Sequence, residues 1–176
     1  CMTNLSIYTE HVKVKNYDAA YTPWKMVYET CPELNYANFL YGKRILKDKI
    51  KKSSGADKDG FIKDLEGLYD GSLKYFPKKA KLAGVIIDKV LLRYDNKMIS
   101  DDEIYSMLGE AFTKDLSNFK NPKALYLYFS SLVDLNKAGK KDLQEVFDVY
   151  DNVTAKIEDE NAKLTDALAK LLPKEE

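Results

Sequence analysis

The sequence has few of the residues that most often mark catalytic and metal sites. Among its 176 residues there is one histidine, His11, and there are two cysteines, Cys1 and Cys31. A lone histidine has no companion histidine with which to hold a metal ion. The sequence also has no glycine-rich phosphate loop that ends in Lys-Ser or Lys-Thr. We therefore expect a non-enzymatic protein without a metal or another cofactor.

Three further shortages exclude other classes. Eight glycines and five prolines are few for an all-β protein. The 28 basic and 28 acidic residues give a formal net charge of zero, so no global field favours nucleic acid. Apolar runs stay below the roughly 18 residues needed to span a membrane, because Asp88 and Lys89 interrupt the longest run, "LAGVIIDKVLL". We expect neither nucleic-acid binding nor membrane insertion.

What the sequence has is helical periodicity and many aromatic residues. It is 45% hydrophobic and contains 13 tyrosines. Apolar residues recur at three- and four-residue intervals, and no segment shows the alternation typical of strands. The pattern predicts an all-α fold of short antiparallel pairs, with helices at about 3–14, 17–31, 39–50, 61–76, 79–94, 100–116, 125–135 and from 141 onward.

The connections between these helices carry three further predictions. The segment "KKSSGADKDG", residues 51–60, is the clearest loop, and Asp57 or Asp59 is a candidate cap for the helix after it. "SDDE", residues 100–103, is a capping-box pattern. The last helix either continues to Pro173 or breaks near Asp159.

Prolines punctuate the chain at a regular interval. Pro32, Pro77 and Pro122 are 45 residues apart, and each is expected to end an even-numbered helix. The odd-numbered helices carry a small residue near the middle, namely Gly42, Gly84, and Ser130 or Ser131, which would let a neighbouring helix approach closely. Both features predict stacked helical hairpins, each of which buries its face on the next.

The first hairpin carries a resemblance to a known family. "KNYDAAYTPWKMVYETCP", residues 15–32, resembles the second half of a tetratricopeptide repeat. The positions that match its pattern of small, aromatic and proline residues are Ala20, Trp24, Val27 and Pro32, with Tyr17 at the helix junction. The second unit keeps the register at Leu65, Tyr69, Ser72 and Pro77, whereas the third keeps Pro122 alone. The first half departs from the pattern at Asn4 and Tyr8.

The resemblance implies a right-handed α-solenoid of about four antiparallel helix pairs in one domain, residues 1–176, although a 45-residue period also suits HEAT-like or armadillo-like pairs. The expected units are 1–32, 33–77, 78–122 and 123–158, followed by a capping helix at 159–172. The apolar stripe of that last helix could cap the array, which we favour, or pair with another chain. Its members are Leu164, Ala167, Leu168 and Leu171.

The odd-numbered helices of tetratricopeptide arrays line a concave face, so the resemblance implies a non-catalytic protein–protein interaction scaffold. A mildly basic, aromatic face suits an acidic or extended peptide. By analogy the face comprises Thr9, Lys13, Tyr36, Phe39, Lys43, Lys47, Lys81, Asp88 and Lys89. The alternative is a module that binds a small ligand or glycan through exposed tyrosines and convergent amides. An enzyme would need a cluster of acidic residues with shifted pKa values around His11.

The two cysteines bear on the cellular compartment. Cys1 begins the first helix and Cys31 ends the second, so an antiparallel hairpin brings them together. A disulfide there would stabilise the fold by roughly 3–4 kcal/mol and would require an oxidising compartment; the alternative is two free thiols. The tyrosine-rich units also resemble a group of secreted bacterial tetratricopeptide repeat proteins, which favours a periplasmic or secreted location. The chain starts inside a helical pattern, which we interpret as a piece of a longer protein.

Overall fold

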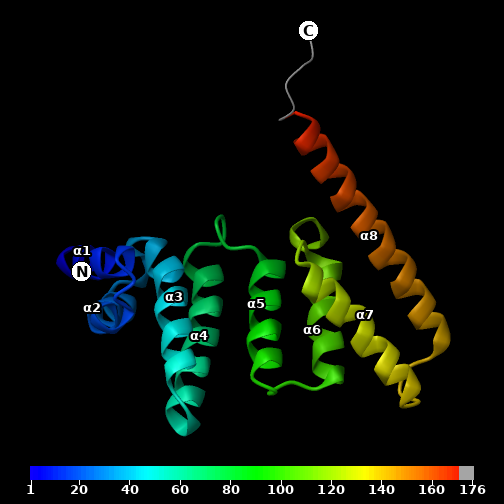
Figure 1. Cartoon of the computed structure of the whole chain (residues 1–176), viewed down its shortest axis with the longest axis horizontal. Helices are drawn as coiled ribbons and strands as arrows, with labels where there is room; N and C mark the ends of the chain where they lie inside the picture. The colour runs from blue at the N-terminus through cyan, green and yellow to red at the C-terminus, as the bar shows by residue number, and fades with distance from the viewer. Residues whose placement is uncertain (171–176) are drawn as a thin grey trace. The chain divides into compact units, whose positions relative to one another are not determined.

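The structure is a computed structural model that describes residues 1–170, and this part is all-helical as predicted (Figure 1). No strand occurs among residues 1–170. The helices are α1 (Met2–Lys13), α2 (Tyr17–Thr30), α3 (Ala37–Lys52), α4 (Gly55–Tyr75), α5 (Leu82–Asp95), α6 (Asp101–Lys114), α7 (Pro122–Lys137) and α8 (Leu143–Ala169). Two short 3-10 turns, η1 (Pro32–Leu34) and η2 (Leu116–Asn118), lie between α2 and α3 and between α6 and α7.

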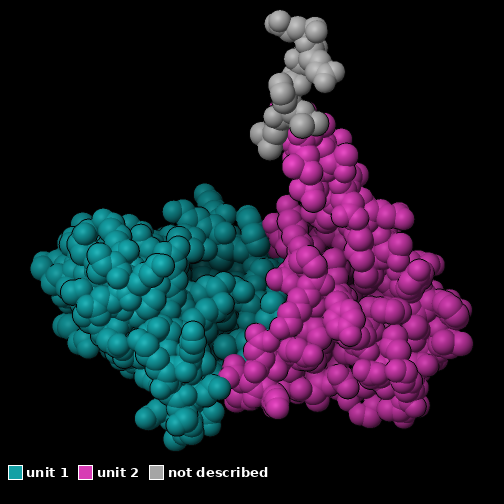
Figure 2. Space-filling view, viewed as in Figure 1, with its two compact units in different colours: residues 1–92 teal, residues 93–176 magenta. Residues whose placement is uncertain are grey.

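The chain divides into two compact units (Figure 2). Unit 1 spans Cys1–Leu92 and unit 2 spans Arg93–Glu176. In unit 1, α1 packs against α2 and α3, α2 packs against α3, and α3 packs against α4. In unit 2, α7 packs against both α6 and α8. The chain from α1 to α4 and the chain from α6 to α8 thus pack each helix on the next.

A close approach of two helices centres unit 1. Gly42 of α3 lies directly against the indole of Trp24 from α2, so that a Cβ on Gly42 would come within 2.6 Å of the ring. The ring of Tyr28 stacks on the same indole at 5.5 Å between centroids. The predicted role of Gly42 is confirmed. Gly84 has no such role, because an added Cβ there would meet no described atom within 4 Å.

A buried amide joins three elements of unit 1. Asn38 of α3 is fully buried. Its Oδ1 accepts a hydrogen bond from the Tyr8 hydroxyl of α1, and its Nδ2 donates to the Pro32 carbonyl at 3.1 Å. Its own carbonyl accepts from Trp24 Nε1 at 2.8 Å. A buried polar group is tolerated when its hydrogen bonds are made, and here they orient α1, α2 and α3 relative to one another.

The two cysteines form a disulfide in the first hairpin. Cys1 precedes α1 and Cys31 caps α2, and their Cα atoms lie 6.5 Å apart. The bond closes a loop with a sequence separation of 30 residues. It joins the start of α1 to the end of α2.

The predicted ten-residue loop after α3 is wrong. Only Ser53 and Ser54 separate α3 from α4. Gly55 has a φ of 56°, which glycine adopts without strain and which allows so short a connection. Asp57 does not cap the helix; it lies within the first turn, where its charge favours the helix N-terminus. The polar composition of residues 51–60 reflects an exposed helix start rather than a loop.

The ends of α2, α4 and α6 share one backbone conformation. The C-cap residues Cys31, Phe76 and Asp115 have φ between −150° and −135° and ψ between 48° and 58°. Each donates its backbone N–H to the carbonyl four residues earlier. These equivalent positions are separated by 45 residues (76 − 31) and then by 39 (115 − 76).

The third proline is therefore out of register with the first two. Pro32 and Pro77 directly follow their C-caps, but the equivalent position after Asp115 is Leu116. The prediction that Pro122 ends the sixth helix is wrong, because Pro122 begins α7. Proline suits the first helical turn, since the N–H that it lacks would have no partner there.

Unit 2 begins with the predicted capping box. The Ser100 hydroxyl accepts from the backbone N–H of Glu103, and the Glu103 carboxylate accepts from the backbone N–H of Ser100. Farther along α6, the Tyr105 hydroxyl donates to Glu145 of α8 at 2.7 Å. Lys141 donates to the same carboxylate at 2.9 Å. The Tyr105–Glu145 hydrogen bond joins α6 to the first turn of α8.

Helix α8 is continuous from Leu143 to Ala169, so no break occurs near Asp159. All of residues 161–170 are exposed. In the predicted capping stripe, Leu164 and Leu168 are 59% and 55% exposed, and Leu171 lies outside the described residues. Figures 1 and 2 show this end of α8 extending beyond the rest of unit 2. Residues 161–169 thus cover no other part of unit 2.

Candidate functional site

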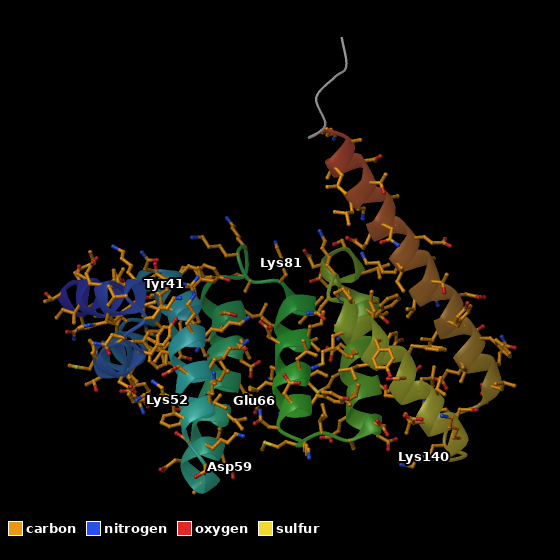
Figure 3. All side chains as sticks on the ribbon, viewed as in Figure 1. Tyr41, Lys52, Asp59, Glu66, Lys81 and Lys140 are labelled. Atoms are coloured by element: carbon orange, nitrogen blue, oxygen red, sulfur yellow. A yellow bond between two sulfur atoms is a disulfide. The ribbon has the colours of Figure 1, made fainter. Side chains whose placement is uncertain are left out.

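Unit 1 contains a pocket of about 260 Å³ between α3, α4 and α5. Five of the nine residues predicted to form a binding face line this α3–α5 pocket: Tyr36, Phe39, Lys43, Lys81 and Asp88. Lys81 directly precedes α5 (Figure 3). The remaining lining residues are Leu40, Leu68, Tyr69, Ser72, Lys79, Ala80, Gly84 and Val85.

The other four predicted residues do not line the pocket. Thr9 and Lys13 lie on α1, where Lys13 pairs with Glu10 at 2.7 Å. Lys47 is exposed on α3. Lys89 of α5 pairs instead with Asp70 of α4 at 2.9 Å. The structure therefore gathers five of the nine predicted residues in one pocket and places the other four outside it.

Aromatic rings form one wall of the pocket. The ring of Tyr36 lies 6.2 Å from that of Phe39 and 5.4 Å from that of Phe76, measured between centroids. The ammonium of Lys79 lies 5.4 Å from the Tyr36 centroid, within the range of a cation–π interaction. The rings thus hold a cation at the pocket beside an apolar surface.

An ion pair between two helices also lines the pocket. Lys43 of α3 donates to Asp88 of α5, and each side chain is about one-third exposed. The Lys43 ammonium also lies 5.5 Å from the centroid of the Tyr69 ring. Such a half-exposed pair contributes little to stability, about 1 kcal/mol or less, but it holds both charges at the pocket.

The Tyr69 hydroxyl is the unusual group of this pocket. Tyr69 is 5% exposed, and its Oη has no hydrogen-bond partner among the described residues. Burial, together with the negative charge of Asp88, raises the pKa of Tyr69, so the hydroxyl stays protonated and able to donate. A buried polar group without a partner is costly in free energy. Tyr69 is one of the residues that line the pocket.

Together the lining residues can recognise a group of mixed character. Phe39, Leu40 and Val85 offer apolar surface. Lys79 and Lys81 offer cations, the Tyr69 hydroxyl offers a neutral donor, and Asp88 can accept a hydrogen bond from an N–H group. This combination can contact an apolar group, a negative charge and an N–H donor.

The sequence interpretation missed Tyr69 and Lys79 as site residues. Tyr69 has the helical spacing of a core residue, and its ring is indeed buried. Nothing in the sequence shows that its hydroxyl lacks a partner. Lys79 lies in the connection after Pro77, and its proximity to Tyr36 depends on how α3 and α5 pack. The one available signal was the run of lysines Lys78, Lys79 and Lys81 around a helix start.

Elsewhere in residues 1–170, no group of three or more His, Cys, Asp or Glu side chains is placed to hold a metal ion. Hydrogen bonds to the ionised form lower the pKa values of the described carboxyls Asp18, Glu103, Glu145 and Glu160. Within the described helices, none is long and apolar enough to cross a membrane.

The chain was compared with protein-family models, with curated proteins and with solved structures, and no match was found in any of the three.

Proposed function

We propose that the chain is a non-catalytic protein-interaction module that binds an extended, acidic peptide segment of a partner protein in the α3–α5 pocket. Lysine side chains at the pocket, Lys43, Lys79 and Lys81, outnumber the single acid Asp88. This balance favours an acidic ligand. The aromatic wall and the apolar residues add surface for an aliphatic side chain of the same segment.

The observation that carries the proposal is the unpartnered hydroxyl of Tyr69. A phenylalanine would fill the same space without the cost of burying a polar group. A peptide carbonyl or carboxylate that reached the Tyr69 hydroxyl would satisfy it. The pocket volume of about 260 Å³ suits one or two side chains and falls below the roughly 300–1,000 Å³ typical of small-molecule sites.

The proposal includes the stacked, tetratricopeptide-like architecture in which odd-numbered helices form the binding face. The shared C-cap conformation of Cys31, Phe76 and Asp115 supports a repeated helical hairpin. Within unit 1, the contact between α1 and α3 supports the stacking of odd-numbered helices. A right-handed solenoid of about four pairs is the arrangement that we propose on these grounds.

The proposal also includes an oxidising location. The Cys1–Cys31 disulfide supports a periplasmic or secreted protein, because disulfides persist in such compartments and are rare in the cytosol.

A glycan or small-ligand module is the less favoured function. Glycan recognition would require several amide side chains that converge beside the tyrosines. The described residues that line the α3–α5 pocket include neither asparagine nor glutamine. Their lysines and apolar groups match a peptide better.

Selection of random displayed peptides on the immobilised full chain tests the proposal. We expect the selected peptides to be rich in Asp and Glu. Their affinity should fall about tenfold or more in Lys43→Glu and in Lys79→Glu. The control is Lys63→Glu, which changes an exposed lysine of α4 outside the pocket by the same charge.

Equal losses in all three variants would indicate binding by net charge alone and would contradict the proposed pocket. Failure to enrich any acidic peptide, while a glycan array gives a ligand sensitive to Lys43→Glu, would favour the alternative function.

A further inference from the structure

Helix α8 carries a regular apolar seam that unit 2 leaves exposed. Its positions alternate in spacing between four and three residues from one end of the described helix to the other. This is the heptad spacing of a helix that packs along another helix. The residues of this α8 seam are Leu143, Phe147, Tyr150, Thr154, Ile157, Asn161, Leu164 and Leu168.

The seam is distinct from the stripe by which α8 is packed in unit 2. Val149 and Val153 are the buried apolar residues of α8, and they lie beside the seam rather than on it. Except for Thr154, which is half-buried, all seam residues are exposed. A helix that needed only to pack in its own unit would require one apolar stripe, whereas α8 has two.

A hollow of about 420 Å³ lies along the seam between α7 and α8. Leu125, Tyr126 and Phe129 of α7 face Tyr150 and Ile157 of α8 across it. Tyr126 is 68% exposed although it borders this apolar surface. A helix laid on the seam could insert a large side chain into the hollow and contact both α7 and α8.

The polar residues of the α8 seam determine the register of a helix that binds there. The alternating four- and three-residue steps fit only one heptad register. In this register, Thr154 and Asn161 occupy the same heptad position as Phe147 and Leu168. A single asparagine in that position typically sets the register of a coiled coil at some cost in stability. An occupant with a polar residue opposite Asn161 would satisfy its amide.

The charges beside the seam specify the chemistry of the occupant. Asp151 and Glu158 lie seven residues apart on its outer flank, both are exposed, and neither forms an ion pair with any described residue. By contrast, Glu160 on the inner flank is already paired with Lys156 at 2.6 Å. The unpaired acids form a row that matches basic side chains at the same seven-residue spacing.

A second copy of this chain is a poor occupant. In an antiparallel self-pair the outer flanks meet, and acids would face acids. In a parallel self-pair the outer flank meets the inner flank, where Val146 and Val153 supply no cation. We propose instead that the α8 seam binds one amphipathic helix of a different protein, with lysines or arginines opposite Asp151 and Glu158.

Two synthetic helical peptides of four heptads test this inference on the full chain. Both have leucine or isoleucine along their seam and one asparagine aligned with Asn161; the flanks carry lysine in one peptide and glutamate in the other. We expect fluorescence anisotropy to show about tenfold tighter binding of the lysine peptide. The double variant Asp151→Lys/Glu158→Lys should reverse this preference.

Matched variants separate the seam from general charge. Asp159→Lys/Asp166→Lys makes the same charge change at two exposed positions seven residues apart on the opposite face, and it should keep the preference for the lysine peptide. Leu164→Asp should abolish binding of both peptides. Because Leu164 is exposed, circular dichroism should show an unchanged fold.

Three results would overturn the inference. Equal binding of the two peptides would contradict the preference for a basic partner. If neither peptide binds, the α8 seam is not a docking surface for a helix. A dimer of the chain alone in sedimentation, made monomeric by Leu164→Asp, would assign the seam to a second copy. Lys43→Glu in the α3–α5 pocket should leave peptide binding to the seam unchanged, so this test is independent of the proposed function.

Discussion

Gly42 and Trp24 form the tightest described helix–helix contact at a glycine in this chain. A Cβ added to Gly42 would lie 2.6 Å from three atoms of the indole ring, a distance that no real contact tolerates. The indole cannot retreat easily, because its Nε1 donates to the carbonyl of Asn38 and Tyr28 stacks on its face. The backbone of α3 or the tryptophan would have to move.

Gly42→Ala should therefore lower the free energy of unfolding of unit 1 by about 2 kcal/mol, the cost typical of overpacking a core. Gly84→Ala is the matched control. An added Cβ on Gly84 meets no described atom within 4 Å, so this change should stabilise by up to about 1 kcal/mol through better helix propensity. Urea unfolding followed by the fluorescence of Trp24, the single tryptophan, measures both. Equal effects at the two glycines would contradict the close approach.

Reduction of the Cys1–Cys31 disulfide should lower the stability of unit 1 by about 3 kcal/mol, because the open chain regains the entropy of a 30-residue loop. Trp24 fluorescence during urea unfolding, with and without dithiothreitol, checks this. The double variant Cys1→Ser/Cys31→Ser should match the reduced protein and should not respond to the reductant. Titration of two free thiols in the untreated, unfolded chain would contradict the bond.

Glu145 should make unit 2 sensitive to acid. Its pKa is held below the ordinary 4.5 by the hydrogen bond from Lys141 and then by that from Tyr105. Since the folded chain binds this proton more weakly than the unfolded chain, the pairing stabilises unit 2 above the unfolded pKa. That stabilisation is lost as the pH falls through the lower folded pKa. The effect should be small, about 1 kcal/mol or less, for a side chain that is one-third exposed.

Glu145→Gln should accordingly reduce the loss of thermal stability between about pH 6 and about pH 3, measured by circular dichroism. The control is Glu158→Gln, which removes an exposed carboxylate of the same helix without an ion pair among the described residues. A pH dependence that is the same in both variants would contradict the hydrogen bonds from Lys141 and Tyr105 to the ionised Glu145.

Elements that depend on local pattern were predictable from the sequence, and those that depend on where distant segments meet were not. The periodicity of apolar residues predicted the helices, and Ser100 with Glu103 predicted the start of α6. The prediction that Pro122 ends a helix was wrong because proline is common both after the end of a helix and in its first turn. Asn38 gave no sequence signal, since its role arises from the side chains of Tyr8 and Trp24 that converge on it.

The candidate site shows the same limit. Lysines and aromatic residues on odd-numbered helices pointed to Tyr36, Phe39, Lys43, Lys81 and Asp88, which the structure gathers in one pocket. The even-numbered helix α4 supplies Tyr69, which its spacing assigned to the core. Whether a buried hydroxyl has a partner is a property of three-dimensional packing, so no periodicity could reveal it.

Tyr69→Phe should separate the stability of the pocket from its function. Removing a buried hydroxyl that has no partner should raise the free energy of unfolding of unit 1 by about 1 kcal/mol. Tyr8→Phe is the matched control, because Tyr8 is equally buried but its hydroxyl donates to Asn38. That change should lower stability by about 1 kcal/mol or more.

In peptide-binding assays, Tyr69→Phe should be the more harmful of the two changes, although it is the less harmful one for stability. Tyr69→Phe should weaken the binding of acidic peptides selected on the α3–α5 pocket by about fivefold or more, since an uncharged hydrogen bond to the ligand contributes roughly 1 kcal/mol. Tyr8→Phe should leave binding unchanged in the folded protein, because Tyr8 does not line the pocket. If the Tyr69 hydroxyl lowers the stability of the free protein but strengthens peptide binding, the ligand forms a hydrogen bond with it. If Tyr69→Phe changes neither quantity, the hydroxyl is hydrated and the pocket loses its main argument.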